Sequence, residues 1–141
     1  MRESLIEAEL LFVSRHYRIA LLEIPVDVHT VVPQLKIPSF GSCPNYGEEV
    51  FALARDKDLL LMARRGTILQ LQHCHMFRSH CLFVDYKLPN CGGGGPVVNR
   101  SGDVVGMSFH YDSGISAILS ISTAISCVNM WTDFGFVSPL L

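Results

Sequence analysis

A run of four glycines, followed by two short apolar segments, constrains the fold of this chain more than any other feature. The glycines occupy residues 92–95 and are followed by Pro96, the apolar pair 97–98, a polar turn and a second apolar segment at 104–109. Glycine readily adopts positive φ, so successive N–H groups can turn toward one point, and a β-hairpin behind the loop would hold it in place. This stretch therefore predicts an anion-binding or oxyanion-binding loop carried on a hairpin.

The rest of the chain has short apolar segments at near-regular spacing, a pattern typical of an all-β barrel. Residues 3–12 have a composition that also suits a short helix. Prolines at 25, 33, 38 and 44 predict a long surface connection over residues 25–46. Ser122 is expected to cap a closing helix that runs to Trp131. The remaining predicted strands cover residues 47–54, 59–71, 82–86 and 115–121.

Composition narrows the function classes. A length of 141 residues fits one domain, and a net charge of −2 with scattered basic residues argues against a nucleic-acid partner. The apolar runs are much shorter than the ~20 residues of a membrane-spanning helix, so no membrane partner is expected. Five cysteines without regular spacing indicate thiols in a reducing intracellular compartment. Arg2 and Glu3 interrupt any signal-peptide core, and nothing indicates a cofactor.

Gly94-Gly95-Pro96 and the strand after them closely resemble the nucleophile loop of trypsin-like serine proteases, especially the Deg/HtrA branch. The segments 7–11, 16–24, 47–54 and 65–68 resemble other strands of the same family, and the resemblance implies that 7–11 and 16–24 are strands. The similarity is greatest to divergent plant-type members without a PDZ domain. It implies a chymotrypsin-like fold, with remnant first-barrel strands in 1–24, the inter-barrel connection in 25–46, the second barrel in 47–121 and a C-terminal helix in 122–134.

The catalytic triad is where the sequence departs from that family. The resemblance places Gly93 at the serine position and Arg18 at the aspartate position, whereas His16 lies beside Arg18 and is not the family histidine. Only 17 residues precede Arg18, so we expect the histidine strand to be missing. A glycine cannot form an acyl-enzyme, and an arginine would oppose the imidazolium that the triad needs. The sequence therefore predicts a serine-endopeptidase relative without an intact catalytic site, which binds an extended peptide or a protein partner.

Two alternatives remain at this point. Cys91 lies two residues before the missing serine and could act as a thiol nucleophile if a histidine came within reach. The chain could also be a truncated product with no selected function, which predicts aggregation through an exposed apolar face or an open strand edge. The residues expected to form the oxyanion loop are Cys91, Gly92, Gly93, Gly94 and Gly95.

Histidines and cysteines also gather in residues 73–81, which raises the question of a metal site. Their spacing matches no zinc module, and polar hairpin residues with half-buried thiols are the expected interpretation. The glycine loop is not a phosphate-binding P-loop, because a proline and a strand follow it instead of Gly-Lys-Ser/Thr and a helix. The cluster consists of His73, Cys74, His75, His80 and Cys81.

Overall fold

The computed structural model describes residues 5–25, 27, 35–69, 81–111 and 114–135. The chain divides into two compact units, which are described separately here. The first unit comprises Met1–Ile37 and Ser126–Leu141, and the second comprises Pro38–Ile125.

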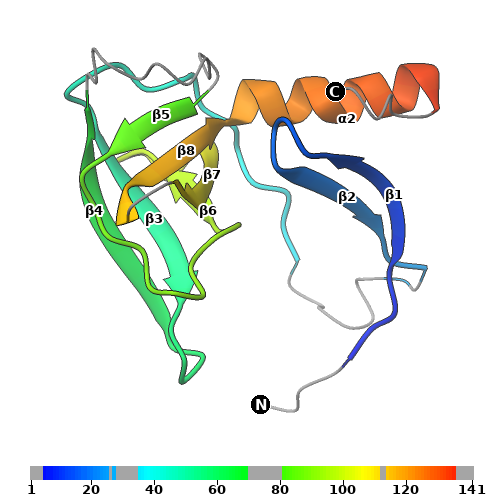
Figure 1. Ribbon diagram of the computed structural model, residues 1–141, viewed down its shortest axis with the longest axis horizontal. Helices are drawn as coiled ribbons and strands as arrows, with labels where there is room; N and C mark the ends of the chain where they lie inside the picture. Colours follow the sequence, from blue (N-terminus) through cyan, green and yellow to red (C-terminus); the bar gives the residue numbers. More distant parts are fainter. Residues whose placement is uncertain (1–4, 26, 28–34, 70–80, 112–113, 136–141) are drawn as a thin grey trace. The chain divides into compact units, whose positions relative to one another are not determined.

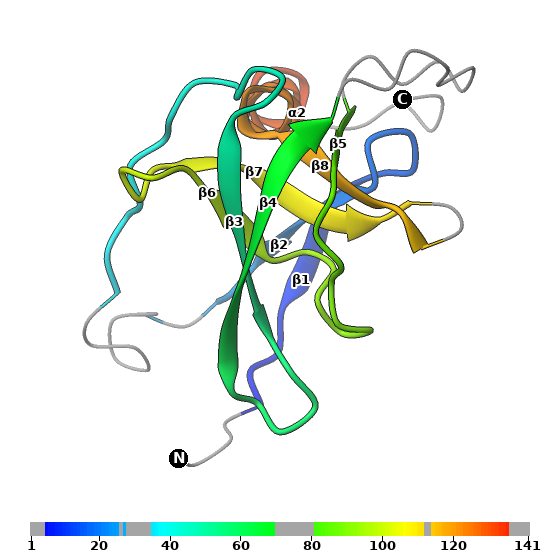
Figure 2. The same ribbon diagram turned by 90° about the vertical axis from the view of Figure 1, so that its left-hand side faces the viewer.

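The second unit is a closed barrel of six antiparallel strands in the order β3-β4-β5-β8-β7-β6 (Figures 1 and 2). Pairing of β3 with β6 through Phe51–Val98 and Ala52–Val97 closes it. The all-β barrel prediction is confirmed, with each predicted strand displaced by a few residues at most. The described residues before β3, 35–46, contain a single bridge from Phe40 to Val104 and no strand, as expected for a connection. The strands are β3 Glu49–Arg55, β4 Leu61–Leu69, β5 Cys81–Val84, β6 Pro96–Val98, β7 Val104–His110 and β8 Ser116–Ser120.

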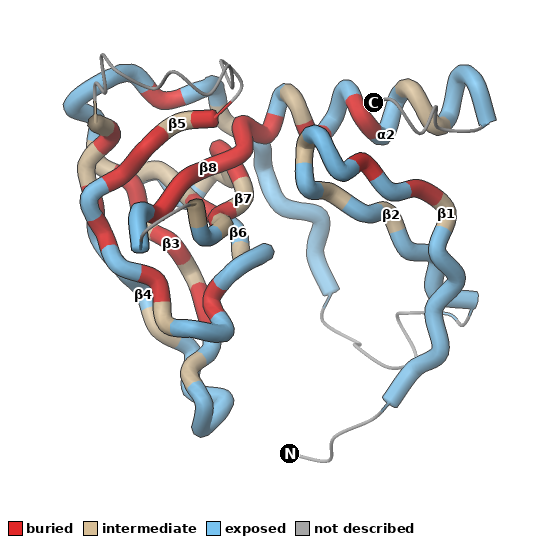
Figure 3. The backbone as a smooth tube through the Cα atoms, viewed as in Figure 1, coloured by how far each residue is buried: buried red, intermediate tan, exposed pale blue. Residues whose placement is uncertain are grey.

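The core of the barrel follows from the alternation of side chains along its strands. In β3, Val50, Ala52 and Ala54 are buried while the residues between them are partly exposed, as the two-residue period of a strand requires. Figure 3 shows the buried positions concentrated in the barrel strands. Tyr86 is buried among these aliphatic residues, and burial raises the pKa of its hydroxyl, which has no hydrogen-bond partner among the residues described. The core cluster consists of Val50, Ala52, Ile68, Val84, Tyr86, Leu88, Val97, Val105 and Ile118.

A charged clamp holds the outside of the barrel at one end of β3. The carboxylate of Glu49 accepts hydrogen bonds from Arg65 on the neighbouring strand β4 and from Arg100, whose Nε lies 2.9 Å away in the turn after β6. The hydrogen bond from Arg100 is the main cause that lowers the pKa of Glu49, and the bond from Arg65 adds to it. The carboxylate of Glu49 thereby links β3 to β4 and to the turn after β6.

The first unit contains a two-stranded antiparallel sheet of β1 (Glu9–Ser14) and β2 (Ile19–Glu23). Both predicted strands are present, but the expectation that residues 16–24 are all extended is wrong. Residues 15–18 form the turn between the strands, and Arg18 has a φ of 56°. A positive φ is left-handed and does not occur in a regular β-strand, so Arg18 belongs to the turn and not to the strand.

The helix α2 (Ile121–Phe134) begins directly after β8, and the division between the two units falls within it. It starts one residue before the predicted cap, so Ser122 lies in its first turn and Ser120 precedes it. The hydroxyls of these two serines are 2.7 Å apart. Among the described residues, no helix is long and apolar enough to span a membrane.

Candidate functional site

The glycine loop lies between β5 and β6 and is fixed by hydrogen bonds to β7. Gly94 donates its N–H to the carbonyl of Ser108 at 2.7 Å, and Ser108 donates its own N–H to the carbonyl of Gly95 at 2.9 Å. The buried hydroxyl of Ser108 also approaches the carbonyls of Gly92 and Gly95 at 3.3 and 3.2 Å. Because Ser108 of β7 bonds both Gly94 and Gly95, these hydrogen bonds fix the loop to the barrel.

Two of the glycines are required by geometry. Gly94 has a φ of +87°, which disfavours any side chain. A Cβ on Gly95 would lie 2.2 Å from the carbonyl oxygen of Leu53 in β3, so only glycine allows the loop to pack this closely on the strand.

Two amides of the predicted oxyanion loop have no acceptor in the described part of the chain. Gly92 donates to the carbonyl of Pro89 at 2.8 Å and Gly94 donates to β7, whereas the N–H groups of Cys91 and Gly93 donate to no acceptor within the described residues. Backbone N–H groups in folded proteins are normally paired, so an outward acceptor such as water or a ligand carbonyl is the expected partner of these two.

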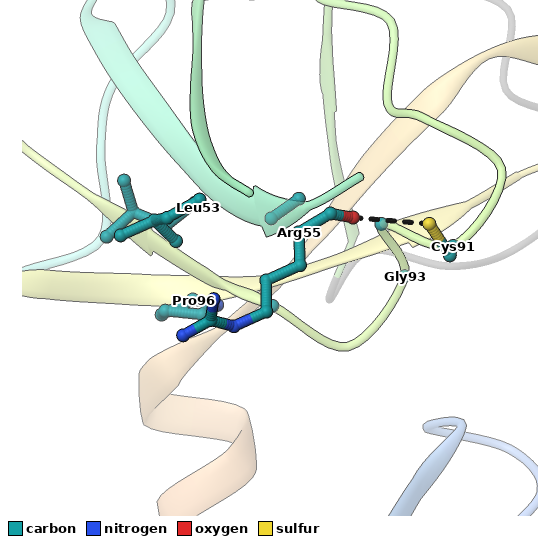
Figure 4. Close-up of a pocket in the computed structure, with 9 residues that line it drawn as sticks. Leu53, Arg55, Cys91, Gly93 and Pro96 are labelled. Carbon is teal, nitrogen blue, oxygen red and sulfur yellow. Dashed lines mark hydrogen bonds between the residues drawn. The ribbon is translucent and has the colours of Figure 1, made fainter. Parts of the chain in front are cut away.

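A cavity of about 300 Å³ opens beside this loop (Figure 4). Its walls combine the far end of β3, the start of β4 and the loop backbone. The lining is predominantly apolar, which suits an apolar side chain better than a charged one. The cavity is lined by Leu53, Ala54, Arg55, Leu61, Cys91, Gly92, Gly93, Gly95 and Pro96.

Gly93 itself lacks a side chain but has room for one. Within the described residues, the nearest atom to a Cβ built there is Cδ2 of His110, at 3.7 Å, which is an ordinary van der Waals distance. His110 is exposed at the end of β7, and its Nε2 lies 3.2 Å from the carbonyl oxygen of Pro89. Since a carbonyl can only accept, Nε2 carries a proton in this contact and cannot also accept one from a nucleophile.

His110 and Ser108 were missed as site residues by sequence reasoning. The signal that could have found them is the antiparallel pairing of β6 with β7. Pro96 lies opposite Met107 in that ladder, so the residues just after Met107 must run alongside the loop that precedes Pro96.

Cys91 is an exposed thiol that contributes to the cavity wall. Its Sγ lies 3.2 Å from the carbonyl oxygen of Arg55 (Figure 4), to which the thiol donates. The nucleophilic form of a cysteine is the thiolate, which has no proton to donate in such a contact. No histidine is a hydrogen-bond partner of Cys91 in the described part of the chain.

The remaining candidate residues from the sequence lie away from the glycine loop or outside the described residues. Arg18 and His16 belong to the turn of the first unit, where the His16 ring meets the Tyr17 ring edge-on at 4.7 Å. His73, Cys74, His75 and His80 lie outside the described residues. The fifth member of that cluster, Cys81, is buried in β5. Within the described residues, no three potential ligands come together as a metal site.

A six-stranded antiparallel barrel with a glycine loop leading into β6 defines the class of chymotrypsin-like β-barrel proteins. The chain belongs to the trypsin-like peptidase domain family, which matches residues 2–107, more than half of its length. No curated protein sequence matches it.

Solved structures of HtrA and Deg proteases share this fold. The serine endoprotease from Yersinia pestis is 20% identical, with a TM-score of 0.72 over 92% of this chain and 46% of its own. Deg5 is 16% identical, with a TM-score of 0.74 over 94% of this chain and 64% of its own. An HtrA-type protease solved with a decapeptide is 16% identical, with a TM-score of 0.70 over 91% of this chain and 40% of its own. This chain thus spans about half the length of the similar structures, and identities this low establish the fold and not the activity.

Proposed function

We propose that this chain is a member of the trypsin-like peptidase family that binds extended peptides at its glycine loop without cleaving them. The observation that carries the proposal is the loop itself. It combines two amides without internal acceptors, an adjacent apolar cavity and, at Gly93, no side chain where the family resemblance expects the nucleophile.

The absence of hydrolysis follows from the chemistry of the loop. Peptide hydrolysis by this family needs a nucleophile together with a base that removes its proton. Gly93 supplies no nucleophile, and Arg18 stands where the resemblance expects the carboxylate. His110 points a protonated nitrogen at Pro89, so it is not placed as the base in this conformation. Oxyanion-hole donors alone give a rate too low to be useful for an amide bond.

Binding, in contrast, does not need the triad. A peptide carbonyl can accept hydrogen bonds from the amides of Cys91 and Gly93 while an apolar side chain enters the cavity, and main-chain hydrogen bonds supply affinity without a serine. An HtrA-type protease of similar fold has been solved with a decapeptide, which supports a peptide as the class of ligand. The proposed ligand is therefore an extended peptide with an apolar side chain near the bound carbonyl.

A matched pair of leucines tests this site. Leu61 lines the cavity and Leu60 does not, although their exposed fractions are 65% and 64%. We expect Leu61→Asp to weaken binding of a fluorescein-labelled decapeptide library with apolar centres by tenfold or more, measured by fluorescence polarisation, because a buried leucine contributes roughly 1.5–3 kcal/mol.

The control variant Leu60→Asp should bind as the unmodified chain does. Equal affinities for the two variants, or no binding by the unmodified chain, would contradict the proposal.

Hydrolysis through Cys91 is the alternative, and exposure of its thiol at the cavity wall is the observation in its favour. It requires the thiol to leave the Arg55 carbonyl and ionise, and it predicts peptide cleavage that is lost in Cys91→Ala. The plant-type affiliation, the compartment and the identity of any protein partner stay predictions.

A further inference from the structure

The glycine loop has open space where a side chain of Gly93 would project. The nearest described atom to a Cβ built there is Cδ2 of His110, at 3.7 Å, so the space reaches from the loop backbone to the edge of the imidazole ring. The N–H of Gly93 is one of the two loop amides without an acceptor in the described part of the chain, and the N–H of Cys91 is the other. The loop therefore leaves room, beside these amides, for an acceptor group with two oxygens.

The wall of the adjacent cavity contains a cation and no carboxylate. Arg55 is the residue with a charged side chain among those that line the cavity, and Figure 4 shows this side chain directed toward Pro96. Its Nη1 donates to the carbonyl oxygen of Leu59 at 2.6 Å, a neutral acceptor, and no carboxylate of the described residues forms an ion pair with it. A negatively charged ligand group would therefore be attracted to this cavity.

The carboxylates next to Arg55 in the sequence belong to the turn after β3. The Oδ1 of Asp56 accepts the N–H groups of Asp58 and Leu60 at 2.8 and 3.0 Å, so this carboxylate stabilises the turn. Neither aspartate lines the cavity, and Lys57 lies between them in the sequence. Arg55 is therefore the charge that a ligand in the cavity meets.

We propose that the preferred ligand of this site is the free C-terminus of a peptide whose last residue is apolar. This inference rests on the proposed peptide binding at the glycine loop and specifies which part of the peptide is bound. The terminal carboxylate accepts hydrogen bonds from the amides of Cys91 and Gly93, and its second oxygen takes the open space at Gly93. The last side chain enters the apolar cavity. Backbone N–H groups are a recurring means of capturing peptide C-termini.

A carboxylate gains more from these donors than the carbonyl group of an internal residue does. A hydrogen bond to an ionised acceptor is roughly twice as strong as one between neutral groups. Arg55 adds an attraction that a neutral amide lacks, although its exposure to solvent keeps this contribution small. The carboxylate also loses part of its hydration on binding, which reduces the advantage. We expect a free acid to bind ~fivefold or more tightly than the amide of the same peptide.

Fluorescence polarisation with one labelled decapeptide in three forms tests this preference. The forms are a free acid that ends in leucine, its C-terminal amide, and an amide with a glutamate added after the leucine. Equal affinities for the acid and its amide would overturn the inference and leave peptide binding at the loop intact. A glutamate amide that binds as tightly as the free acid would overturn the assignment to the C-terminus. No binding of any form would contradict the proposed function itself.

Two cations of the same turn test the role of charge. We expect Arg55→Gln to lower the ratio of acid affinity to amide affinity about threefold, because it removes the cation from the cavity wall. Lys57→Gln is the matched control, since Lys57 is also exposed but does not line the cavity, and its ratio should equal that of the unmodified chain. Circular dichroism of both variants shows that the fold is retained. An unchanged ratio in Arg55→Gln, or an equal fall in both variants, would overturn recognition of the carboxylate through this cavity.

Discussion

Gly93 and Gly95 differ sharply although they are two residues apart in one loop. Gly93 has an ordinary φ and open space where a side chain would project, whereas Gly95 packs directly on the carbonyl of Leu53. The absence of a side chain at Gly93 is therefore not a requirement of packing. The barrel could accommodate the serine that the family resemblance expects at this position.

This contrast predicts unequal effects of the same substitution. Gly93→Ser should change the free energy of unfolding by less than about 0.5 kcal/mol, as surface substitutions usually do, whereas Gly95→Ser should cost about 3 kcal/mol or more through overpacking against the backbone. Urea denaturation of both variants measures the difference. Comparable losses in the two variants would show that the space at Gly93 is not open.

The same Gly93→Ser variant is expected to remain without peptidase activity, since a serine without a positioned base keeps its proton. Restored cleavage of a peptide substrate would mean that another residue, such as His110, acts as the base.

At the scale of the elements, the strands were predictable because each carries its own pattern. Alternation in β3 and the valines of β6 and β7 place these segments in a barrel without further information. The turn at residues 15–18 was not predictable in this way, because Arg18 is not a residue that favours positive φ and the segment continues into apolar residues. The contacts of Ser108 and His110 with the loop depend on strand register, which local patterns do not determine. The loop was therefore recognised from its glycines, while the residues that hold it were not.

The Glu49 clamp is the element-scale feature with a pH dependence. A carboxylate whose pKa is lowered in the folded state stabilises the fold above its unfolded pKa, about 4.3 for glutamate, and loses this contribution as the pH falls through the folded value. We therefore expect Glu49→Gln to be less stable than the unmodified chain at pH 7, and the difference to shrink as the pH falls below about 4.

Thermal unfolding at pH 7 and pH 3 measures this dependence. Glu48→Gln is the control, since Glu48 is exposed and its side chain bonds only Asn45 among the described residues. A Glu49→Gln variant as stable as the Glu48→Gln variant at pH 7 would show that the two arginines contribute nothing through Glu49.

At the scale of the whole molecule, the chain combines a closed barrel with a small second unit. The barrel has its own core and carries every residue that lines the candidate cavity, so the proposed peptide ligand is assigned to residues 38–125. The first unit exposes apolar residues at Leu10, Val13 and Leu22, which the truncated-product interpretation would connect with aggregation.

Peptide binding without cleavage is tested most directly when both are measured in one mixture. The unmodified chain is incubated with the decapeptide library at concentrations where fluorescence polarisation shows saturation, and the peptides are then analysed by mass spectrometry. We expect the bound peptides to remain intact, with no cleavage products above those in a sample without protein. Cleavage products in the presence of the chain would contradict it, and their loss in Cys91→Ala would identify the thiol as the nucleophile.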